Sequence, residues 1–144
     1  MKKAIALLLA LVMVFALCAC GGGDKGTADN GEKVVKIGVF EPASGDSGAG
    51  GKKEMLGMQY ANQETPTVEI GGETYKVELV YSDNGSDSAK AVSAASKLVN
   101  EKVSLVLGSY GSGVSIAASD TFKQAGIPAI GVTCTNPNVT AGNS

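Results

Sequence analysis

The stretch Val103–Leu107, read as VSLVL, leads directly into Gly108–Ser115, read as GSYGSGVS. Four of the five residues in VSLVL are apolar, a pattern typical of a strand buried on both faces of a parallel sheet. The glycines that follow indicate a tight turn, and a helix is predicted to begin near Ser112 or Gly113. Such a junction presents free backbone N–H groups and the positive end of a helix dipole. It therefore suits an anion, and a phosphate and a carboxylate are both candidates.

The segments on either side of this strand alternate between strand-like and helix-like patterns. Gly71-Gly72 predicts a hairpin between two β-rich runs, and Val92, Ala95 and Leu98 lie on the apolar stripe of a helix with one buried face. This alternation predicts an α/β fold with a doubly wound parallel sheet and helices on both faces. The expected strands are Val34–Phe40, Thr67–Ile70, Thr74–Tyr81, Val103–Leu107 and Ile127–Val132, and the expected helices are Lys52–Gln63, Ser88–Lys102 and Val114–Ala125.

Loops that follow the strands are expected to meet at one edge of the sheet, where ligands bind in such folds. Asp83 and Asp87 in one of these loops are interpreted as turn and helix-cap residues. The chain stops soon after the last of the loops, with no closing helix, so we expect it to be the N-terminal part of a longer protein. The four loops are Glu41–Gly51, Ser82–Asp87, Ser109–Gly113 and Thr133–Pro137.

The N-terminus has the features of an export signal. The opening MKK is followed by the apolar run Ala4–Ala19, which is typical of a signal peptide over residues 1–19 and is shorter than the ~18–20 apolar residues that a membrane span needs. The end of this run, LCAC, resembles a bacterial lipobox, which implies cleavage before Cys20 and attachment of lipid to it. The polar tract 20–33 is then expected to be a flexible tether to the cell membrane.

The composition limits the chemistry. The 144 residues include no His and 12 basic residues, all of them Lys. Without His, neither a Ser-His-Asp triad nor an imidazole metal site can form within the chain. Without Arg, a bound anion receives no bidentate guanidinium clamp, so backbone N–H groups, hydroxyls or Lys must hold it. The net charge of −2 does not favour nucleic acid. We expect no cofactor, no metal and no catalysis.

Three segments, VKIGVFEPASG, YSDNGSDSAKAVSAASKLVNEKVSLVLGSYGSG and ASDTFKQAGIPAIGVTCTNP, resemble a known family. They are similar to the solute-binding lipoproteins of ABC importers, in the branched-chain amino-acid (Leu/Ile/Val) binding family, and the similarity covers Val34–Thr140. The resemblance implies the type I periplasmic-binding-protein fold, with two lobes, a hinge and a ligand in the cleft between the lobes. Residues 34–144 would form an incomplete N-terminal lobe of this leucine-binding type.

The resemblance also implies roles for five residues. Ser112 matches a serine that holds the α-carboxylate of the ligand through its hydroxyl and N–H. Thr135 matches a threonine that binds the same carboxylate and reaches the ammonium group, and Thr133 matches a residue whose carbonyl accepts from the ammonium. Tyr110 and Gly111 match residues that line the pocket.

Some of these positions also have purely structural interpretations. Ser112 could be an ordinary helix N-cap, and Thr133 and Thr135 could be plain loop hydroxyls. Cys134 between them is interpreted as a small buried filler. Gly50 stands where some family members have an aromatic side chain over the ligand, which implies a wider pocket here.

The resulting expectation is an extracytoplasmic binding protein, lipid-anchored to a bacterial cell membrane. It would capture an amino acid, branched-chain or otherwise, or a similar small carboxylate, and pass it to ABC permease subunits. An extracellular sensor domain of the same fold is the main alternative, and a secreted enzyme with a nucleotide-binding sheet is a third.

Overall fold

The computed structural model describes residues 32–142 of the chain. The expected signal peptide (1–19), the lipidation at Cys20 and most of the tether 20–33 lie outside the described residues. The elements in chain order are β1 (Val34–Glu41), α2 (Gly48–Glu64), β2 (Thr67–Ile70), β3 (Glu73–Asp83), α3 (Ser88–Asn100), β4 (Leu105–Leu107), α4 (Ser112–Gln124), β5 (Ala129–Ile130) and the short 3-10 helix η1 (Pro137–Val139).

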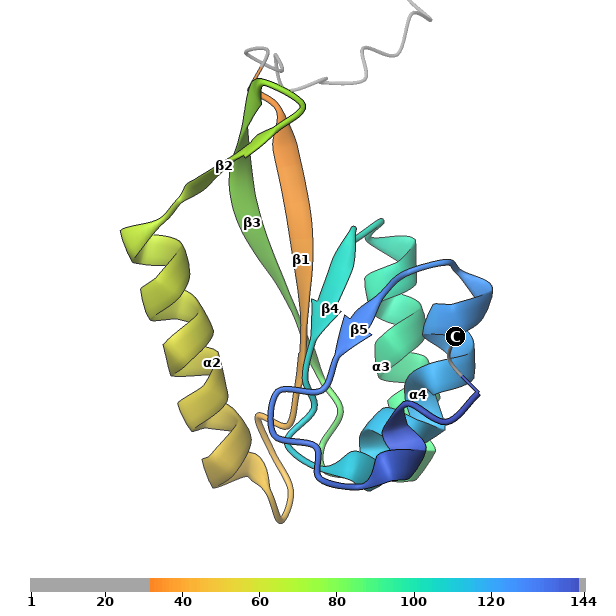
Figure 1. Cartoon of the computed structure of the whole chain (residues 1–144). Coiled ribbons are helices and arrows are strands. Elements are labelled where there is room, and N and C mark those ends of the chain that lie inside the picture. The colour runs from red at the N-terminus through yellow and green to blue at the C-terminus, as the bar shows by residue number, and fades with distance from the viewer. Residues whose placement is uncertain (1–31, 143–144) are drawn as a thin grey trace, which may run out of the picture. The chain divides into compact units, whose positions relative to one another are not determined.

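One five-stranded sheet organises these elements, with strand order β2-β3-β1-β4-β5 (Figure 1). β1 pairs in parallel with both β3 and β4, and β5 pairs in parallel with β4. Only β2 runs antiparallel, and it forms a hairpin with β3. The connecting residues Gly71 and Gly72 have φ of 61° and 82°, the left-handed conformation that a tight hairpin turn requires. The predictions of a parallel α/β sheet and of this hairpin are confirmed.

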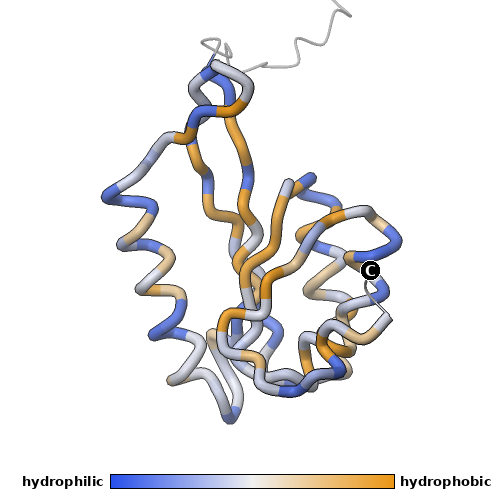
Figure 2. The backbone as a smooth tube through the Cα atoms, viewed as in Figure 1, coloured by the Kyte–Doolittle hydropathy of each residue, from blue (hydrophilic) through white to orange (hydrophobic). Residues whose placement is uncertain are grey.

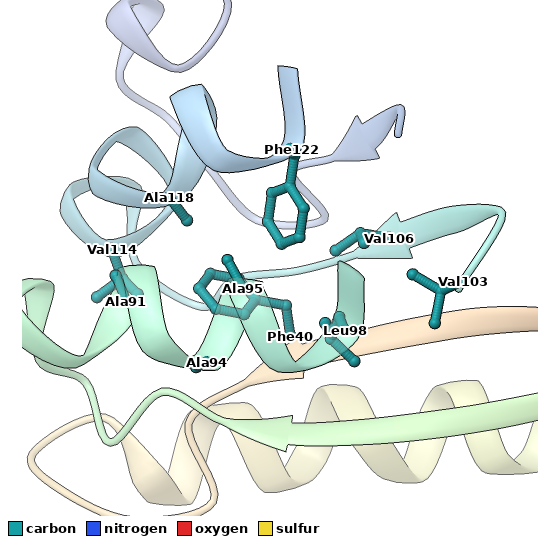
Figure 3. Close-up of a cluster of buried hydrophobic side chains, with 10 residues drawn as sticks. All are labelled: Phe40, Ala91, Ala94, Ala95, Leu98, Val103, Val106, Val114, Ala118 and Phe122. Atoms are coloured by element: carbon teal, nitrogen blue, oxygen red, sulfur yellow. The ribbon is translucent and has the colours of Figure 1, made fainter. Parts of the chain in front are cut away.

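The hydrophobic core lies between the sheet and the helices α3 and α4 (Figure 3). Small residues on α3 let α4 approach closely, and the rings of Phe40 and Phe122 meet edge to face with centroids 5.5 Å apart, a favoured geometry for aromatic pairs. The apolar stripe predicted on α3 is partly wrong, because Val92 is 50% exposed. The buried members of the core are Phe40, Ala91, Ala94, Ala95, Leu98, Val103, Val106, Val114, Ala118 and Phe122.

Figure 1 shows α2 on the other side of the sheet from α3 and α4, as predicted. It begins at Gly48, four residues before the expected start at Lys52. The glycines there allow close contact rather than a loop, since a β-carbon added at Gly51 would lie 2.3 Å from the carbonyl oxygen of Pro42. Apolar side chains farther along α2 remain exposed, namely Leu56 and Tyr60, and Figure 2 shows less apolar character on α2 than on the strands.

The strands at the other end of the sheet are shorter than expected. β4 covers only the last three residues of the predicted VSLVL strand, and β5 covers two of the expected six. Val106 is buried, whereas its neighbours in β4 are half-buried, so burial on both faces holds for the middle of this strand alone. No helix within residues 32–142 has both the length and the apolar character needed to cross a membrane.

Candidate functional site

The carboxyl ends of β1, β3 and β4 are tied together by one buried side chain. Asn84, which is fully buried, donates from Nδ2 to the carbonyl oxygen of Phe40 at 3.2 Å and to Oγ of Ser109 at 2.9 Å. Its Oδ1 accepts from the N–H of Ser86 at 3.1 Å. The end of β1 and the loops after β3 and β4 therefore share one hydrogen-bond hub, centred on a residue that the sequence pattern does not single out.

Asp83, next to this hub, organises the turn that follows β3. Its carboxylate accepts from the N–H groups of Ala43 and Gly85, each at 2.8 Å, and from Oγ of Ser44 at 2.7 Å. Partial burial raises the pKa of Asp83, but these hydrogen bonds outweigh it and hold the pKa below the ordinary value of 3.8. The interpretation of Asp83 as a turn residue is confirmed.

Asp87 is the N-cap of α3, with its side chain accepting from the N–H of Ala89 at 2.8 Å. This is the usual arrangement of a helix cap, in which a carboxylate satisfies a donor that has no partner inside the helix. The interpretation of Asp87 as a cap is also confirmed. Both acids are thus occupied in structure rather than available to a ligand.

The start of α4 differs from an ordinary capped helix. The N-cap is Gly111, with φ of 139°, and no side chain caps the helix. Ser112 is the first helical residue, and its Oγ accepts from the N–H groups of Thr135 and Asn136, both at 3.2 Å. The N-cap alternative for Ser112 is therefore wrong, because its side chain fixes the loop that follows β5 instead.

This arrangement leaves hydrogen-bond donors available at the N-terminal start of α4. A serine hydroxyl has one proton and two acceptor lone pairs, so Ser112 can accept from both N–H groups and still donate its proton outward. The N–H groups of the first turn of a helix lack partners within the helix. Together with the positive end of the helix dipole, they favour an anion at this position.

The structure brings some of the predicted site residues together. Ser112 and Thr135 are joined by the hydrogen bond from the Thr135 N–H, and Gly111 and Tyr110 immediately precede Ser112. Thr133 is exposed in the loop after β5, and within the described residues no hydrogen bond links it to the others. Four of the five predicted residues thus meet at the start of α4, and Thr133 lies nearby in the chain without such a contact.

The ring of Tyr110 occupies the space next to Gly50. A β-carbon added at Gly50 would lie 2.6 to 2.8 Å from three atoms of that ring. The absence of a side chain at residue 50 therefore does not simply widen the site, because the aromatic ring of Tyr110, from the loop between β4 and α4, fills the space. Tyr110 is 42% exposed, so one part of its ring packs against α2 and another part faces outward.

Two residues that the sequence analysis did not assign to the site support the loop between β4 and α4. Oγ of Ser115 accepts from the N–H of Ser109 at 3.0 Å and donates to the carbonyl oxygen of Gly111 at 3.4 Å. Sγ of Cys134, which is half-buried, lies 3.2 Å from Oγ of Ser115 and donates to the carbonyl oxygen of Ser109 at 3.4 Å. A serine in the first turns of a helix can bond back to the preceding turn in this way, which is the signal that could have identified Ser115.

Glu41 is a further residue that sequence reasoning missed. It ends β1, is 1% exposed, and accepts from the N–H of Tyr110 through Oε2 at 2.7 Å. Burial, followed by the neighbouring carboxyl of Glu54, raises the pKa of Glu41 from 4.5 to about 8. The sequence did contain a signal for this residue, since Glu41 directly follows the predicted strand Val34–Phe40. Acidic side chains are almost never fully buried without a partner, so a glutamate buried at this position indicates a specific partner.

A separate hollow of about 480 Å³ lies beside α4 and β5, with Phe122, Ile127 and Val139 among its apolar lining. None of the five predicted binding residues lines it. In residues 32–142, no group of three or more His, Cys, Asp or Glu side chains is placed to hold a metal ion.

The site therefore offers N–H and O–H donors and no positively charged side chain among the five residues. Such a set can hold a carboxylate by charge-assisted hydrogen bonds. It contains no nucleophile paired with a base of the kind that covalent catalysis needs. Chemically, this set of donors suits a small anion.

Residues 34–144 match the family described as periplasmic binding protein. Leu/Ile/Val-binding protein homolog 2 of Brucella abortus is 34% identical over 129 residues, covering 90% of this chain and 33% of that protein. The solved leucine binding protein LivK of Thermotoga maritima has a TM-score of 0.69 at 36% identity, covering 76% of this chain and 30% of that one.

A second solved structure is the branched-chain amino acid transporter substrate binding protein LivJ of Streptococcus pneumoniae, in complex with isoleucine. It has a TM-score of 0.67 at 34% identity and covers 76% of this chain and 32% of that one. The chain spans about a third of the length of these three proteins.

Proposed function

This chain belongs to the periplasmic binding protein family, and we propose that it is part of an extracytoplasmic solute-binding protein that delivers an amino acid or a similar small carboxylate to an ABC transporter. The resemblance noted in the sequence agrees with the family match and with the solved leucine- and isoleucine-related proteins. The name printed for LivJ, a transporter substrate binding protein, favours transport over the sensing alternative.

The observation that carries the proposal is the arrangement of Ser112. Its Oγ is held by the N–H groups of Thr135 and Asn136 at the uncapped start of α4. The ligand carboxylate would accept the Ser112 hydroxyl proton and the first-turn N–H groups of α4. This use of uncharged donors is consistent with a chain that contains no Arg.

The ammonium group of an amino acid needs acceptors rather than donors. We assign the carbonyl oxygen of Thr133 and the hydroxyl of Thr135 to this part of the ligand, in the exposed loop after β5. A carboxylate that balances the ammonium charge would come from a second lobe. The ligand would thus be enclosed between two lobes, with its carboxylate toward α4.

The remaining parts of the proposal concern location and partners. Cleavage of the signal peptide and lipidation of Cys20 would tether the protein outside the cytoplasm through residues 20–33. The partners would be the permease subunits of the transporter in the same membrane. The protein would bind and release its ligand without chemistry, and it would need no cofactor.

Calorimetry on the complete protein with a panel of amino acids tests this proposal. At least one of them should bind with micromolar or tighter affinity. Replacing Ser112 by Ala should weaken that binding by about ten- to a hundredfold, because a hydrogen bond to a charged group contributes about 1.5–3 kcal/mol. Ser93→Ala, on the exposed face of α3 where Oγ bonds to the carbonyl oxygen of Lys90, is the matched control.

Two results would count against the proposal in different ways. If the Ser112→Ala, Thr135→Ala double variant bound as tightly as the unmodified protein, the site assignment would be wrong. If the complete protein bound no amino acid and no small organic acid, the function itself would be wrong.

A further inference from the structure

Two buried carboxyl groups meet behind the loop that carries the candidate site. Glu41 ends β1 and is 1% exposed, and Glu54 lies on α2. Both oxygens of Glu54 and Oε1 of Glu41 are buried without a hydrogen-bond donor in the described part of the chain. Among residues 32–142, the donor that reaches the pair is the N–H of Tyr110, which bonds to Oε2 of Glu41. The three remaining oxygens therefore need a partner.

The two carboxyl groups are neighbours, and the Glu54 carboxyl contributes to the raised pKa of Glu41. Two ionised carboxylates cannot bond together because both only accept, whereas one protonated carboxyl donates to the other. The ion pairs that lysines form within residues 32–142 involve other acids, namely Glu32, Glu73 and Glu101. A single shared proton joins two of the three oxygens in one hydrogen bond, with the fewest added components.

We propose that Glu41 and Glu54 share one proton, and that this pair, which carries one negative charge in place of two, is the positioning element that holds the loop Gly108–Ser112 ready for the ligand. Its effect on the ligand rests on the proposed function. The presence of the shared proton is independent of the proposed function, because the buried oxygens are without a partner in the ligand-free protein as well.

Glu41 packs so closely against the loop Gly108–Ser112 that a change in its charge would affect the position of the loop. A β-carbon at Gly108 would lie 2.6 Å from Oε1 of Glu41 and 2.2 Å from the carbonyl oxygen of Phe40. The loop is thus pressed against the end of β1, and Tyr110 is bonded to Glu41 two residues before Ser112. Loss of the proton would place two like charges behind this loop, repel them, and oppose a ligand carboxylate at Ser112.

The charged groups that face Glu41 set the direction of its pH response. Burial and the Glu54 carboxyl on α2 raise its pKa to about 8, against the lowering by the Tyr110 N–H. The folded protein therefore holds the proton more tightly than the unfolded chain, whose value is 4.5. The stability that the pair contributes is complete below that value and is lost as the pH rises through about 8.

The test uses the complete protein and its Glu41→Gln, Glu54→Gln and Glu41→Ala variants. A glutamine at residue 41 retains an acceptor for Tyr110 and offers an N–H to Glu54, so it copies the protonated pair. Glu64→Gln, at the exposed end of the same helix as Glu54, is the matched control. Thermal unfolding of the ligand-free proteins and calorimetry with the bound amino acid are measured from about pH 6 to about pH 9.

The expected results are specific. The midpoint of unfolding of the unmodified protein and of Glu64→Gln should fall by about 5 °C or more over this range, while Glu41→Gln and Glu54→Gln should remain nearly flat. At about pH 9, one unit above the pKa, about one molecule in ten keeps the proton. Affinity should therefore be about tenfold weaker than that of Glu41→Gln. Glu41→Ala should bind weakly at every pH, and glutamine should rescue it.

Other outcomes separate the possible errors. Identical pH profiles for the unmodified protein and both glutamine variants would overturn the shared proton. A recovery of stability at about pH 9 on adding NaCl, but not choline chloride, would assign the site to a cation instead. A stability profile as expected with an unchanged affinity profile would remove the positioning role. If no amino acid bound any variant, the proposed function would fail while the unfolding data still decided the proton.

Discussion

The ring of Tyr110 lies against Gly50, so close that a β-carbon at residue 50 would come within 2.6 Å of it. Gly50 lies in the first turn of α2, and Tyr110 lies in the loop between β4 and α4. The missing side chain on α2 is thus matched by an aromatic side chain from the facing loop. A side chain at residue 50 would therefore conflict with the Tyr110 ring. This conflict can be tested by comparing substitutions of two glycines of α2.

Replacing Gly57 by Ala should stabilise the protein by about 0.5–1 kcal/mol, the usual gain in helix propensity, because nothing lies within 4 Å of a β-carbon there. Gly50→Ala should gain less, since the added methyl group would displace the Tyr110 ring. Urea unfolding of the two variants measures the difference. An equal gain in both would show that Tyr110 does not depend on Gly50.

Gly108 tests how tightly the turn after β4 is constrained. Its φ is 121°, and a β-carbon would meet the carbonyl oxygen of Phe40 at 2.2 Å. Gly108→Ala should therefore lower the free energy of unfolding by about 3 kcal/mol or more. Gly113→Ala, five residues later, meets only Oγ of Ser88 at 3.8 Å and should be neutral or slightly stabilising. Denaturant unfolding compares them, and a mild effect at Gly108 would contradict the close approach.

Asn84 should be essential because its bonds cannot be replaced by water. It is fully buried and bonds to Phe40, Ser86 and Ser109. Asn84→Ala leaves these groups unpaired at a cost of about 1–3 kcal/mol, and it should also weaken ligand binding by loosening three loops. Asn100→Ala at the exposed end of α3 should change stability by less than about 0.5 kcal/mol. Chemical unfolding that did not distinguish the two variants would contradict the role of the hub.

Asp83 should contribute stability that depends on pH in the acidic range. Its folded pKa lies below the unfolded value of 3.8, so the contribution is present above that value and is lost as the pH falls through the folded pKa. Urea midpoints from about pH 6 to about pH 3 should fall less steeply for Asp83→Asn than for the unmodified protein. Ser44→Ala, which removes one of the bonds to Asp83, should give an intermediate slope. Parallel curves for all three would contradict this assignment.

Some elements of the site followed from the sequence because they depend on local chemistry. Asp87 precedes a helix and caps it, and Asp83 stabilises its own turn through the N–H of Gly85. The meeting of Ser112 with Thr135 followed from topology, since parallel strands end at one edge of the sheet. The start of α2 was missed because its glycines are read as a loop until the contact of Gly51 with Pro42 is known.

The sequence alone determined the order of strands and helices, the hairpin turn at Gly71-Gly72 and the edge of the sheet that carries the donors. These depend on periodicity and on the conformations open to each residue. Only the tertiary structure decided that Glu41 is buried against Glu54, and that Tyr110 covers Gly50. Both pairs join segments that are distant in the chain, and a side chain's burial and pKa depend on what packs against it rather than on its neighbours in sequence.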